Sequence, residues 1–265
     1  MLGTVSKAGK VMELFTASSP EWGVSEVARA MVIPKSSAHA LLTTLTDVGL
    51  VRRLPTGRYR LGWLLVSLNR TLLDTTDFVA NKRPGLQILA NRLSATIHLA
   101  ALRGSDVIYL EKVFASEVAN FTDTVVGSRA PAHCTALGKV LLAYSAPNEP
   151  KRIIERDGLA RRTDRTITSW SRLNNELSQV RARGWGYDIN ETVRSLCCVA
   201  APVWDSDGNV QAAISITLGA DRFHQNAEAL RRCLLSTAAE LGRPVGTPVI
   251  TADVGLAESP VRITG

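Results

Sequence analysis

The fold of this chain is decided by residues 25–62, SEVARAMVIPKSSAHALLTTLTDVGLVRRLPTGRYRLG. Apolar residues recur at i, i+3, i+4 and i+7 in two successive groups, Val24, Val27, Ala28 and Met31 and then Ala38, Leu41, Leu42 and Leu45. This spacing predicts two short amphipathic helices. Val32-Ile33 turns the chain between them, Pro34 suits the first turn of the second helix, and Gly49 ends that helix. The segment therefore predicts a helix-turn-helix.

A basic hairpin follows the second helix. Residues 51–54 and 58–61 alternate apolar and basic side chains around Pro55-Thr56-Gly57, which is the pattern of a two-stranded ribbon. The hairpin predicts a wing that presents four arginines at its tip. On the second helix, the side that is not apolar carries short polar and cationic residues, which can reach phosphates or base edges. We therefore predict DNA contacts by Lys35, Ser36, Ser37, His39 and Thr43, with Arg52, Arg53, Arg58 and Arg60 on the DNA backbone.

Positive charge is concentrated at the beginning of the chain. Residues 1–70 hold nine Lys and Arg against four Asp and Glu, and so carry +5 of the total +7. This asymmetry is typical of a nucleic-acid-binding module joined to a nearly neutral domain. A solvated basic face on an ordinary helical domain is the alternative, but it does not explain why the charge coincides with the helix spacing and the hairpin. With 265 residues, 45% of them hydrophobic, the chain is long enough for one large or two modest domains.

The sequence resembles the IclR-type bacterial transcriptional regulators. The resemblance begins in residues 25–62, continues in GSRAPAHCTALGKVLLA (127–143), and resumes in GWGYDINETVRSLCCVAAPVWDSDGNVQAAISIT (184–217). Order and spacing fit over about residues 5–243, which is nearly the whole chain. One departure lies on the second helix, where family members commonly have an arginine at the position of Ala40. Lys35 and the wing arginines are then expected to supply more of the phosphate binding.

The chain divides into four expected parts. These are a winged helix-turn-helix domain at 1–62, a linker helix at 63–81, an α+β effector-binding domain at 82–243 and a flexible tail at 244–265. Leu64, Leu65, Leu68 and Leu72 give the linker an apolar stripe, which predicts contact between subunits. We expect a homodimer or a homotetramer built as a dimer of dimers, and a double-stranded DNA operator with an inverted repeat.

Period and turn signals predict the elements of the effector-binding domain. Helices are expected at 84–95, 136–144, 173–183 and 222–241, and strands at 96–102, 107–113, 196–204 and 210–218. Residues 205–209, DSDGN, are the strongest hairpin signal in the chain. The resemblance implies that these elements form a GAF-like sheet with a small-molecule pocket.

The resemblance also implies which residues line that pocket. Carried over motif by motif, they are Ala119, Thr122, Ala130, Ala136, Leu137, Asn190, Leu196, Cys198, Ser215 and Thr217. Apolar walls, hydroxyls, one amide and a helix N-terminus favour an organic acid, an amide or an aromatic metabolite over a nucleotide. For Cys198, Ser215 or Thr217 taken singly, the alternative is an inward side chain that only satisfies a local hydrogen bond.

Other chemical motifs are incomplete. Gly138-Lys139 resembles the end of a phosphate-binding loop, but His133 stands where that loop needs glycine and Val140 where it needs Ser or Thr. His133 and Cys134 are only two adjacent candidate zinc ligands. His98 alternates within a strand pattern and is expected to be packed or hydrogen-bonded rather than a catalytic base. We expect no cofactor and no enzymatic activity.

Two other functions remain to be tested against this interpretation. One is a metal-dependent enzyme with an accessory basic domain, and the other is an adaptor that binds proteins through the winged domain. Salt-dependent duplex binding separates the adaptor from a DNA-binding regulator. The four cysteines lack C-x-x-C spacing, and the chain has neither a signal peptide nor an apolar run of 18 residues. We therefore expect a cytoplasmic protein with reduced thiols and no membrane partner.

Overall fold

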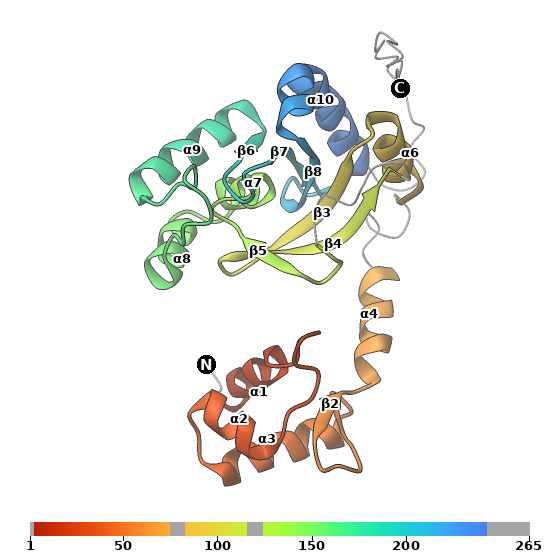
Figure 1. The fold of residues 1–265 in the computed structure, drawn as a ribbon, viewed down its shortest axis with the longest axis vertical. Coiled ribbons are helices and arrows are strands. Elements are labelled where there is room, and N and C mark those ends of the chain that lie inside the picture. The colour runs from red at the N-terminus through yellow and green to blue at the C-terminus, as the bar shows by residue number, and fades with distance from the viewer. Residues whose placement is uncertain (1–2, 75–82, 116–123, 243–265) are drawn as a thin grey trace, which may run out of the picture. The chain divides into compact units, whose positions relative to one another are not determined.

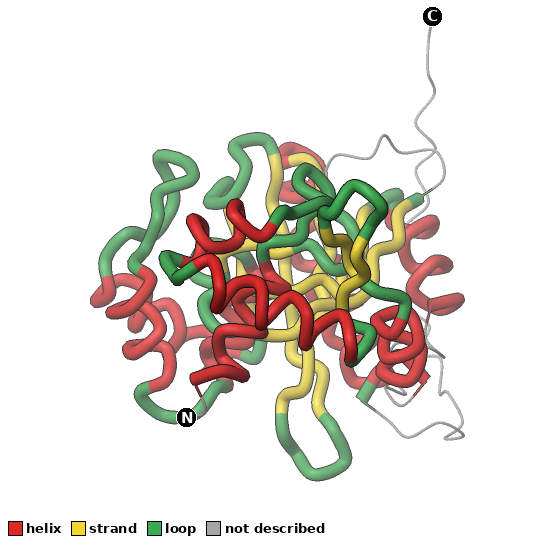
Figure 2. Tube along the Cα trace, turned by 90° about the horizontal axis from the view of Figure 1, so that it is seen from below, coloured by secondary structure: helices red, strands yellow, loops and turns green. Residues whose placement is uncertain are grey.

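A computed structural model describes residues 3–74, 83–115 and 124–242. The chain forms two compact units, Met1–Thr76 and Asp77–Gly265, and each has its own apolar core. Figure 1 labels the helices and strands, and Figure 2 distinguishes helix, strand and loop by colour. No helix within the described ranges is both long and apolar enough to cross a membrane.

The first unit is a winged helix-turn-helix, as the sequence predicts. Its elements are α1 (Gly3–Glu13), α2 (Val24–Met31), α3 (Lys35–Asp47), β1 (Val51–Arg53), β2 (Tyr59–Leu61) and α4 (Leu64–Asp74). Strands β1 and β2 pair antiparallel, and Trp22 adds an isolated bridge to Tyr59. The core joins all of these elements except α4, through Val11, Phe15, Val27, Ala38, Leu41, Leu42, Leu45, Val51 and Tyr59. The helix α1 was not predicted, because only Val11 of its residues is buried.

Helix α4 lies within the predicted linker. Residues 75–81 of that linker are outside the described part of the chain. The exposed fractions of Val66, Leu68 and Leu72 are 61%, 50% and 59%. These side chains do not pack on the core of the first unit. Leu64, Leu68 and Leu72 lie on one side of the helix at i, i+4 and i+8, so this side is an exposed apolar stripe, while Val66 lies on the opposite side.

The second unit is an α+β domain built on one antiparallel sheet. Its elements are α6 (Arg83–Leu93), β3 (Thr96–Arg103), β4 (Asp106–Phe114), β5 (Arg129–Pro131), α7 (Ala136–Tyr144), α8 (Glu149–Asp157), α9 (Trp170–Arg183), β6 (Gly186–Ile189), β7 (Leu196–Trp204), β8 (Val210–Gly219) and α10 (Ala220–Leu241). The strand order is β5-β4-β3-β8-β7-β6. The predicted hairpin of residues 205–209 connects β7 and β8, as expected.

Helices cover both faces of this sheet (Figure 1). Helix α7 packs on the face that carries Ala100, Ala200 and Ala213, and α9 packs on α7. Helix α10 packs on β7 and β8 from the other face, where its Phe223 contacts the ring of Tyr187. Residues that pair across β3, β8 and β7 share a face, because side chains alternate along each strand. The face of the sheet that α7 covers is called the α7 face below.

Three short elements of this domain were not predicted: β5, β6 and α8. Helix α8 carries only Pro150 and Ile153 as buried side chains, so its sequence lacks a continuous apolar stripe. Strands β5 and β6 are three and four residues long and lie at the two edges of the sheet. Such short edge strands give too few residues for a period to be recognised.

Candidate functional site

Helix α3 exposes the residues that were predicted to contact DNA. Its apolar positions, Ala38, Leu41, Leu42 and Leu45, are buried against α2 and the wing. The other side of the helix carries the recognition face, which we define as Lys35, Ser36, Ser37, His39 and Thr43, and all five residues are exposed. Asp47 is exposed on the last turn of the same helix. The recognition face is therefore a surface of short polar groups with one lysine at its N-terminal end.

The turn between α2 and α3 is held in an unusual backbone conformation. Val32 has φ 53° and ψ 50°, which is left-handed, and its N–H donates to the carbonyls of Ala28 and Arg29. A β-branched residue is rarely found there, because its Cβ approaches the following carbonyl. The side chain of Val32 is 90% exposed, so it gains little from packing.

The structure divides the four wing arginines into two pairs. Arg58 donates from Nη2 to the carbonyl of Glu21 at 2.9 Å and to Oε2 of Glu26 at 2.7 Å. Arg60 places Nη2 2.6 Å from Oε1 of Glu21. Arg58 and Arg60, two of the four arginines predicted on the wing, therefore already have carboxylate partners in their own domain. Whether they also contact DNA stays a prediction.

Glu26 ties the wing to the beginning of α2. Its Oε2 accepts the backbone N–H of Gly23 at 2.7 Å and also the Arg58 guanidinium. The backbone hydrogen bond from Gly23, followed by the one from Arg58, lowers the pKa of the Glu26 carboxyl. Glu26 therefore stays ionised and continues to neutralise Arg58 at physiological pH.

The other two arginines of the wing are not neutralised in this way. Arg53 is exposed and makes no ion pair with any of the described residues. Arg52 stacks over Trp63, with its guanidinium carbon 5.3 Å from the ring centroid. Arg53 is thus the wing cation with the fewest competing contacts.

In the second unit, strand pairing brings several predicted ligand residues onto the α7 face. Thr217 pairs with Thr96 on one side and Cys198 on the other, and Ser215 pairs with His98. Leu196 lies two residues before Cys198 on β7, so it shares that face. Ala136 and Leu137 begin α7 and are buried in the core that covers this face. The structure therefore gathers Ala136, Leu137, Leu196, Cys198, Ser215 and Thr217.

A chain of hydrogen bonds crosses this face. The Sγ of Cys198 lies 3.2 Å from Oγ1 of Thr217, which lies 3.4 Å from Nδ1 of His98, and Nε2 of His98 lies 2.9 Å from Oγ1 of Thr124. The expectation that His98 is a packed, hydrogen-bonded residue is confirmed. Burial lowers the pKa of His98 to about 3, so its imidazole is neutral at physiological pH.

Three residues beside this series of hydrogen bonds were not predicted to line the ligand site: Thr96, Tyr109 and Lys112. Thr96 is 1% exposed, and its hydroxyl has no hydrogen-bond partner among the described residues. The ring of Tyr109 lies 5.1 Å from that of His98, and Lys112 pairs with His98 across β3 and β4. Thr96 and His98 are two residues apart in one predicted strand, so the sequence already indicated that they share a face. Only the strand pairing reveals that they lie beside Thr217.

The remaining predicted ligand residues are placed differently. Ala130 lies on the edge strand β5 and packs against the core that contains α7. Asn190 follows β6 with φ 61°, and its amide donates within its own turn to the carbonyls of Arg194 and Leu196. Its Oδ1 accepts from the thiol of Cys197, so binding a ligand there requires exchange of local contacts. Ala119 and Thr122 lie outside the described residues.

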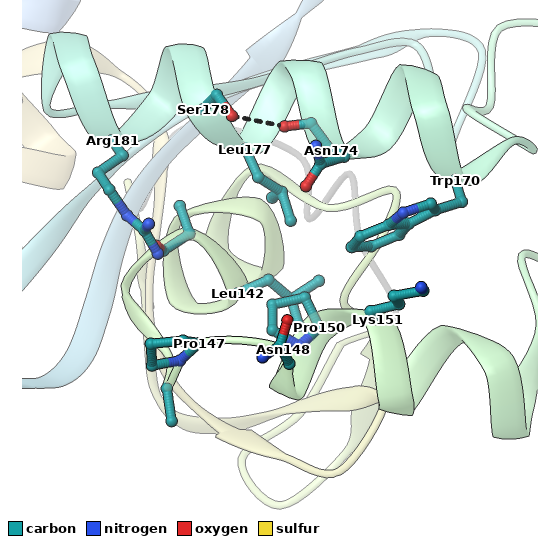
Figure 3. Close-up of a pocket in the computed structure, with 12 residues that line it drawn as sticks. Leu142, Pro147, Asn148, Pro150, Lys151, Trp170, Asn174, Leu177, Ser178 and Arg181 are labelled. Carbon is teal, nitrogen blue, oxygen red and sulfur yellow. Dashed lines mark hydrogen bonds between the residues drawn. The ribbon is translucent and has the colours of Figure 1, made fainter.

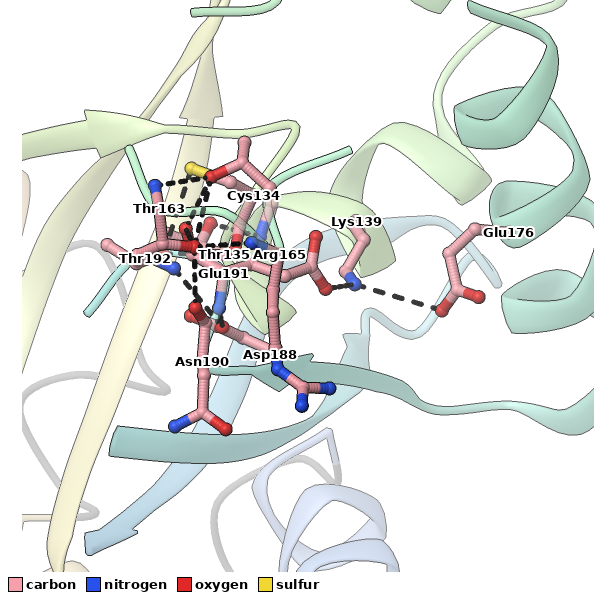
Figure 4. Close-up of polar contacts among 12 residues, drawn as sticks. Cys134, Thr135, Lys139, Thr163, Arg165, Glu176, Asp188, Asn190, Glu191 and Thr192 are labelled. Atoms are coloured by element: carbon pink, nitrogen blue, oxygen red, sulfur yellow. Dashed lines mark hydrogen bonds and ion pairs between the residues drawn. The ribbon is translucent and has the colours of Figure 1, made fainter. Parts of the chain in front are cut away.

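Buried polar contacts fix the N-terminal half of α7 to the loop after β6 (Figure 4). Lys139 is 2% exposed, and its Nζ donates to Oε1 of Glu191. The carboxylate of Asp188 accepts the backbone N–H of Glu191 at 2.7 Å, and the Thr192 hydroxyl donates to the Cys134 carbonyl at 3.0 Å. The lysine of Gly138-Lys139 is therefore used in a structural ion pair.

The residues around Lys139 account for two further motifs. A Cβ at Gly138 would collide with the backbone of Ala132, so the glycine allows α7 to approach that segment. The ring Nε2 of His133 lies 3.0 Å from the carbonyl of Ala160, and the Cys134 thiol is buried facing the Pro131 carbonyl. Both side chains of the candidate zinc pair thus have local protein partners.

Known proteins match both units. Residues 70–243 match the family described as Bacterial transcriptional regulator IclR C-terminal, and residues 4–55 match the IclR helix-turn-helix domain. The HTH-type transcriptional regulator XynR of Escherichia coli (strain K12) is 30% identical over 250 residues, which cover 94% of this chain and 99% of that protein. KdgR of the same organism is 32% identical over 239 residues, covering 89% of this chain and 90% of that protein.

Solved structures agree with these matches. The structure of an IclR transcriptional regulator from Silicibacter sp. TM1040 has a TM-score of 0.80 at 25% identity and covers 93% of this chain and 100% of that one. An IclR homologue from Microbacterium hydrocarbonoxydans, solved in complex with 4-hydroxybenzoate, has a TM-score of 0.71 at 25% identity, covering 90% and 97%. The chain therefore belongs to the IclR family of bacterial transcriptional regulators, with a helix-turn-helix DNA-binding domain followed by an effector-binding domain.

Proposed function

We propose that this regulator works as a dimer, reads an inverted-repeat operator through α3 and the wing, and responds to a small organic effector bound between α7 and the sheet. The observation that supports this proposal most directly is that two kinds of polar surface lie in different units. Exposed cations and short hydroxyls lie in the first unit, and buried neutral hydrogen-bonding groups lie on the α7 face of the second. A protein that acts on bacterial DNA is expected in the cytoplasm.

Contacts with bases are assigned to the recognition face. Ser36, Ser37 and Thr43 have short side chains and are exposed, so the helix backbone can come close to base edges. Lys35 and Arg53 are exposed cations suited to phosphates. Ala40 has no group that can hydrogen-bond a base, so it leaves room for a thymine methyl or a water molecule.

The apolar face of α4 supports a dimer. Leu64, Leu68 and Leu72 are exposed and share one side of the helix at i, i+4 and i+8, and contiguous exposed apolar side chains usually mark an interaction surface. A second copy of α4 is the simplest partner, because twofold symmetry places identical stripes against each other. Two symmetry-related recognition helices then match two inverted half-sites. Assembly of such dimers into a tetramer is compatible with this arrangement.

The effector is proposed to be a small organic acid, amide or aromatic metabolite. The six residues that the structure gathers, together with Thr96 and His98, offer hydroxyls, a thiol and a neutral imidazole within apolar walls. These groups orient one polar head and do not neutralise several phosphates. The 4-hydroxybenzoate bound by the Microbacterium hydrocarbonoxydans homologue is a molecule of this class and a suitable first candidate.

The DNA part of the proposal is tested by selecting operator fragments from genomic DNA and measuring their affinity by fluorescence anisotropy. Lys35→Ala should reduce affinity and flatten the salt dependence. Lys10→Ala is the matched control, since Lys10 is an exposed lysine on α1 outside the recognition face. Equal effects of the two substitutions would contradict the assignment of α3 as the reading helix.

The effector part is tested on the same operator. Ala136→Trp should fill the space at the beginning of α7 and abolish the response to the effector while leaving operator binding largely intact. Thr217→Val removes one hydroxyl without changing the shape of the side chain, and Thr237→Val on α10 is its control. A normal response in the Ala136→Trp variant, or loss of DNA binding while the variant is still folded and oligomeric, would refute the site.

A further inference from the structure

A pocket lies at the C-terminal end of α7 (Figure 3). Its volume is about 240 Å³, and it is lined by the C-terminal end of α7, the beginning of α8 and one side of α9. Both α8 and α9 pack on α7, but they have little contact with each other. The space between them is therefore left unfilled by the fold. The predicted effector residues Ala136 and Leu137 are on the first turn of α7, so this pocket is a separate place.

The floor of the pocket is apolar and one wall is aromatic. Leu142, Leu177 and Pro150 are buried and face the pocket from three different helices. Trp170 begins α9, is partly buried, and presents its indole beside this floor. A flat apolar ring is complementary to such a surface, because it gains contact with both the indole and the leucines. The volume is below the range of about 300–1,000 Å³ found for drug-sized ligands, which points to a molecule with one ring.

The polar lining is positively charged. Lys151 and Arg181 both line the pocket, whereas none of the lining side chains, all in the described part of the chain, is acidic. The Nζ of Lys151 lies 3.8 Å from Oε1 of Glu155, and both side chains are more than half exposed. Such a pair contributes little and leaves the ammonium able to bind another anion.

The guanidinium of Arg181 has N–H groups that its contact with α7 does not use. Its Nε donates to the carbonyl of Ala143 at 2.6 Å, and an Nη2 hydrogen is directed to the same carbonyl. This contact neutralises the partial negative charge at the C-terminal end of α7. A guanidinium has five N–H groups, so three donors remain after these two bonds. The residue can therefore support α7 and still attract an anion.

We propose that this pocket is a second ligand site, which binds a small planar carboxylate. The ring lies on Leu142 and Leu177 beside Trp170, and the carboxylate is held by Lys151, which lies at the same end of the pocket as Trp170 (Figure 3). Arg181, at the opposite end, adds positive charge to the lining. The site does not depend on the effector site at the beginning of α7. Since α7 forms a wall of both, ligands at its two ends contact one rigid element.

The test uses benzoate as the probe, with benzamide as its neutral analogue. The full-length protein is labelled with 5-fluorotryptophan, so that each of its five tryptophans gives a separate fluorine resonance. The Trp170 resonance is assigned with a Trp170→Phe variant. Benzoate should shift this resonance saturably, and benzamide should bind at least about fivefold more weakly, because it lacks the charge.

Two variants on α8 separate the pocket from a general charge effect. Lys151→Gln should weaken the benzoate affinity read at Trp170 by roughly fivefold, the effect expected for loss of one nearby charge. Arg152→Gln is the matched control, because Arg152 is an exposed neighbour that does not line the pocket. Its affinity should equal that of the unmodified protein. Both variants change exposed side chains, and retention of the other four fluorine resonances confirms that they are folded.

Three results would overturn the proposal. They are an unshifted Trp170 resonance at saturating benzoate, equal affinities for benzoate and benzamide, and equal effects of Lys151→Gln and Arg152→Gln. Because the readout is the Trp170 signal and not operator binding, these outcomes are independent of the proposed effector site. Benzoate that binds only near Ala136 would leave Trp170 unshifted and would therefore count against the second site.

Discussion

Replacing Arg53 should change operator binding, whereas replacing Arg58 should change the stability of the wing, although both arginines belong to the wing. Arg58 is bound by Glu21 and Glu26, whereas Arg53 is exposed with no ion pair among the described residues. We expect Arg53→Ala to weaken operator binding with a clear change in salt dependence. Arg58→Ala should leave the salt dependence nearly unchanged and instead loosen the wing.

The magnitudes follow from the contacts. Each phosphate contact contributes about 0.9 to the slope of log affinity against log salt concentration. A dimer carries two copies of Arg53, so Arg53→Ala should reduce the slope by about 1.8. Arg58 donates to the carbonyl of Glu21, next to the backbone bridge between Trp22 and Tyr59. Loss of one such hydrogen bond costs about 1 kcal/mol, which raises the population of locally opened wing by about fivefold.

Two measurements distinguish the outcomes. Anisotropy titrations of the operator at several salt concentrations give the slopes. Hydrogen exchange followed by mass spectrometry gives the opening of the bridge, in which the N–H of Tyr59 donates to the carbonyl of Trp22 at 2.9 Å. A third variant, Glu26→Gln, removes one carboxylate partner of Arg58. The less neutralised guanidinium should make the slope of log affinity against log salt concentration steeper. If Arg58→Ala flattens the slope as much as Arg53→Ala, the guanidinium leaves its carboxylates for phosphate and the reasoning is wrong.

Three further predictions concern α4, the turn before α3 and the α7 face. Leu68→Lys with Leu72→Lys should yield a folded monomer in light scattering, since both side chains are exposed in the single chain; a dimer that persists would exclude α4 as the interface. Val32→Asn should raise the unfolding free energy by about 1 kcal/mol in urea titrations, because asparagine tolerates the left-handed backbone and the valine packs on little. Burial keeps the folded-state pKa of His98 near 3, below its ordinary value of 6.5, so its contribution to stability is complete above pH 6.5 and is lost as the pH falls toward 3. His98→Gln should therefore make stability between pH 6.5 and 4 less steep by up to about 1.4 kcal/mol per pH unit, and an unchanged slope would contradict a neutral buried imidazole.

Local patterns were sufficient to predict the helix-turn-helix and the wing, but not α1. The helices α2 and α3 and the hairpin each have a period or a turn within a few residues, and the structure places all three as expected. The charges of the wing could not be predicted in the same way. Glu21 and Glu26 precede Arg58 by more than thirty residues, and nothing in the sequence between them signals that they meet. The pairing depends on how the wing packs on α2.

Prediction was also partial in the effector-binding domain. Its long strands and α7 were recognised from their period, and Ser215, Thr217 and Cys198 share a face as the family resemblance implies. Thr96 and His98 could not be joined to them, because the antiparallel pairing of β3 with β8 links residues more than a hundred positions apart. The pocket at the C-terminal end of α7 was missed for a related reason: it lies between α8 and α9, which both pack on α7 but have little contact with each other, and α8 itself was not predicted.

The unpartnered hydroxyl of Thr96 suggests where the effector obtains its differential affinity. A buried hydroxyl without a hydrogen bond costs about 1–3 kcal/mol, and Thr96 is 1% exposed with no partner among the described residues. An effector that accepts a hydrogen bond from Thr96 would recover this free energy only in an arrangement that presents this hydroxyl to the ligand. Such a ligand binds one arrangement of the domain more tightly than another, which is the requirement for shifting their populations. At tenfold per 1.4 kcal/mol, this one hydroxyl can change the ratio of two states by roughly five- to a hundredfold.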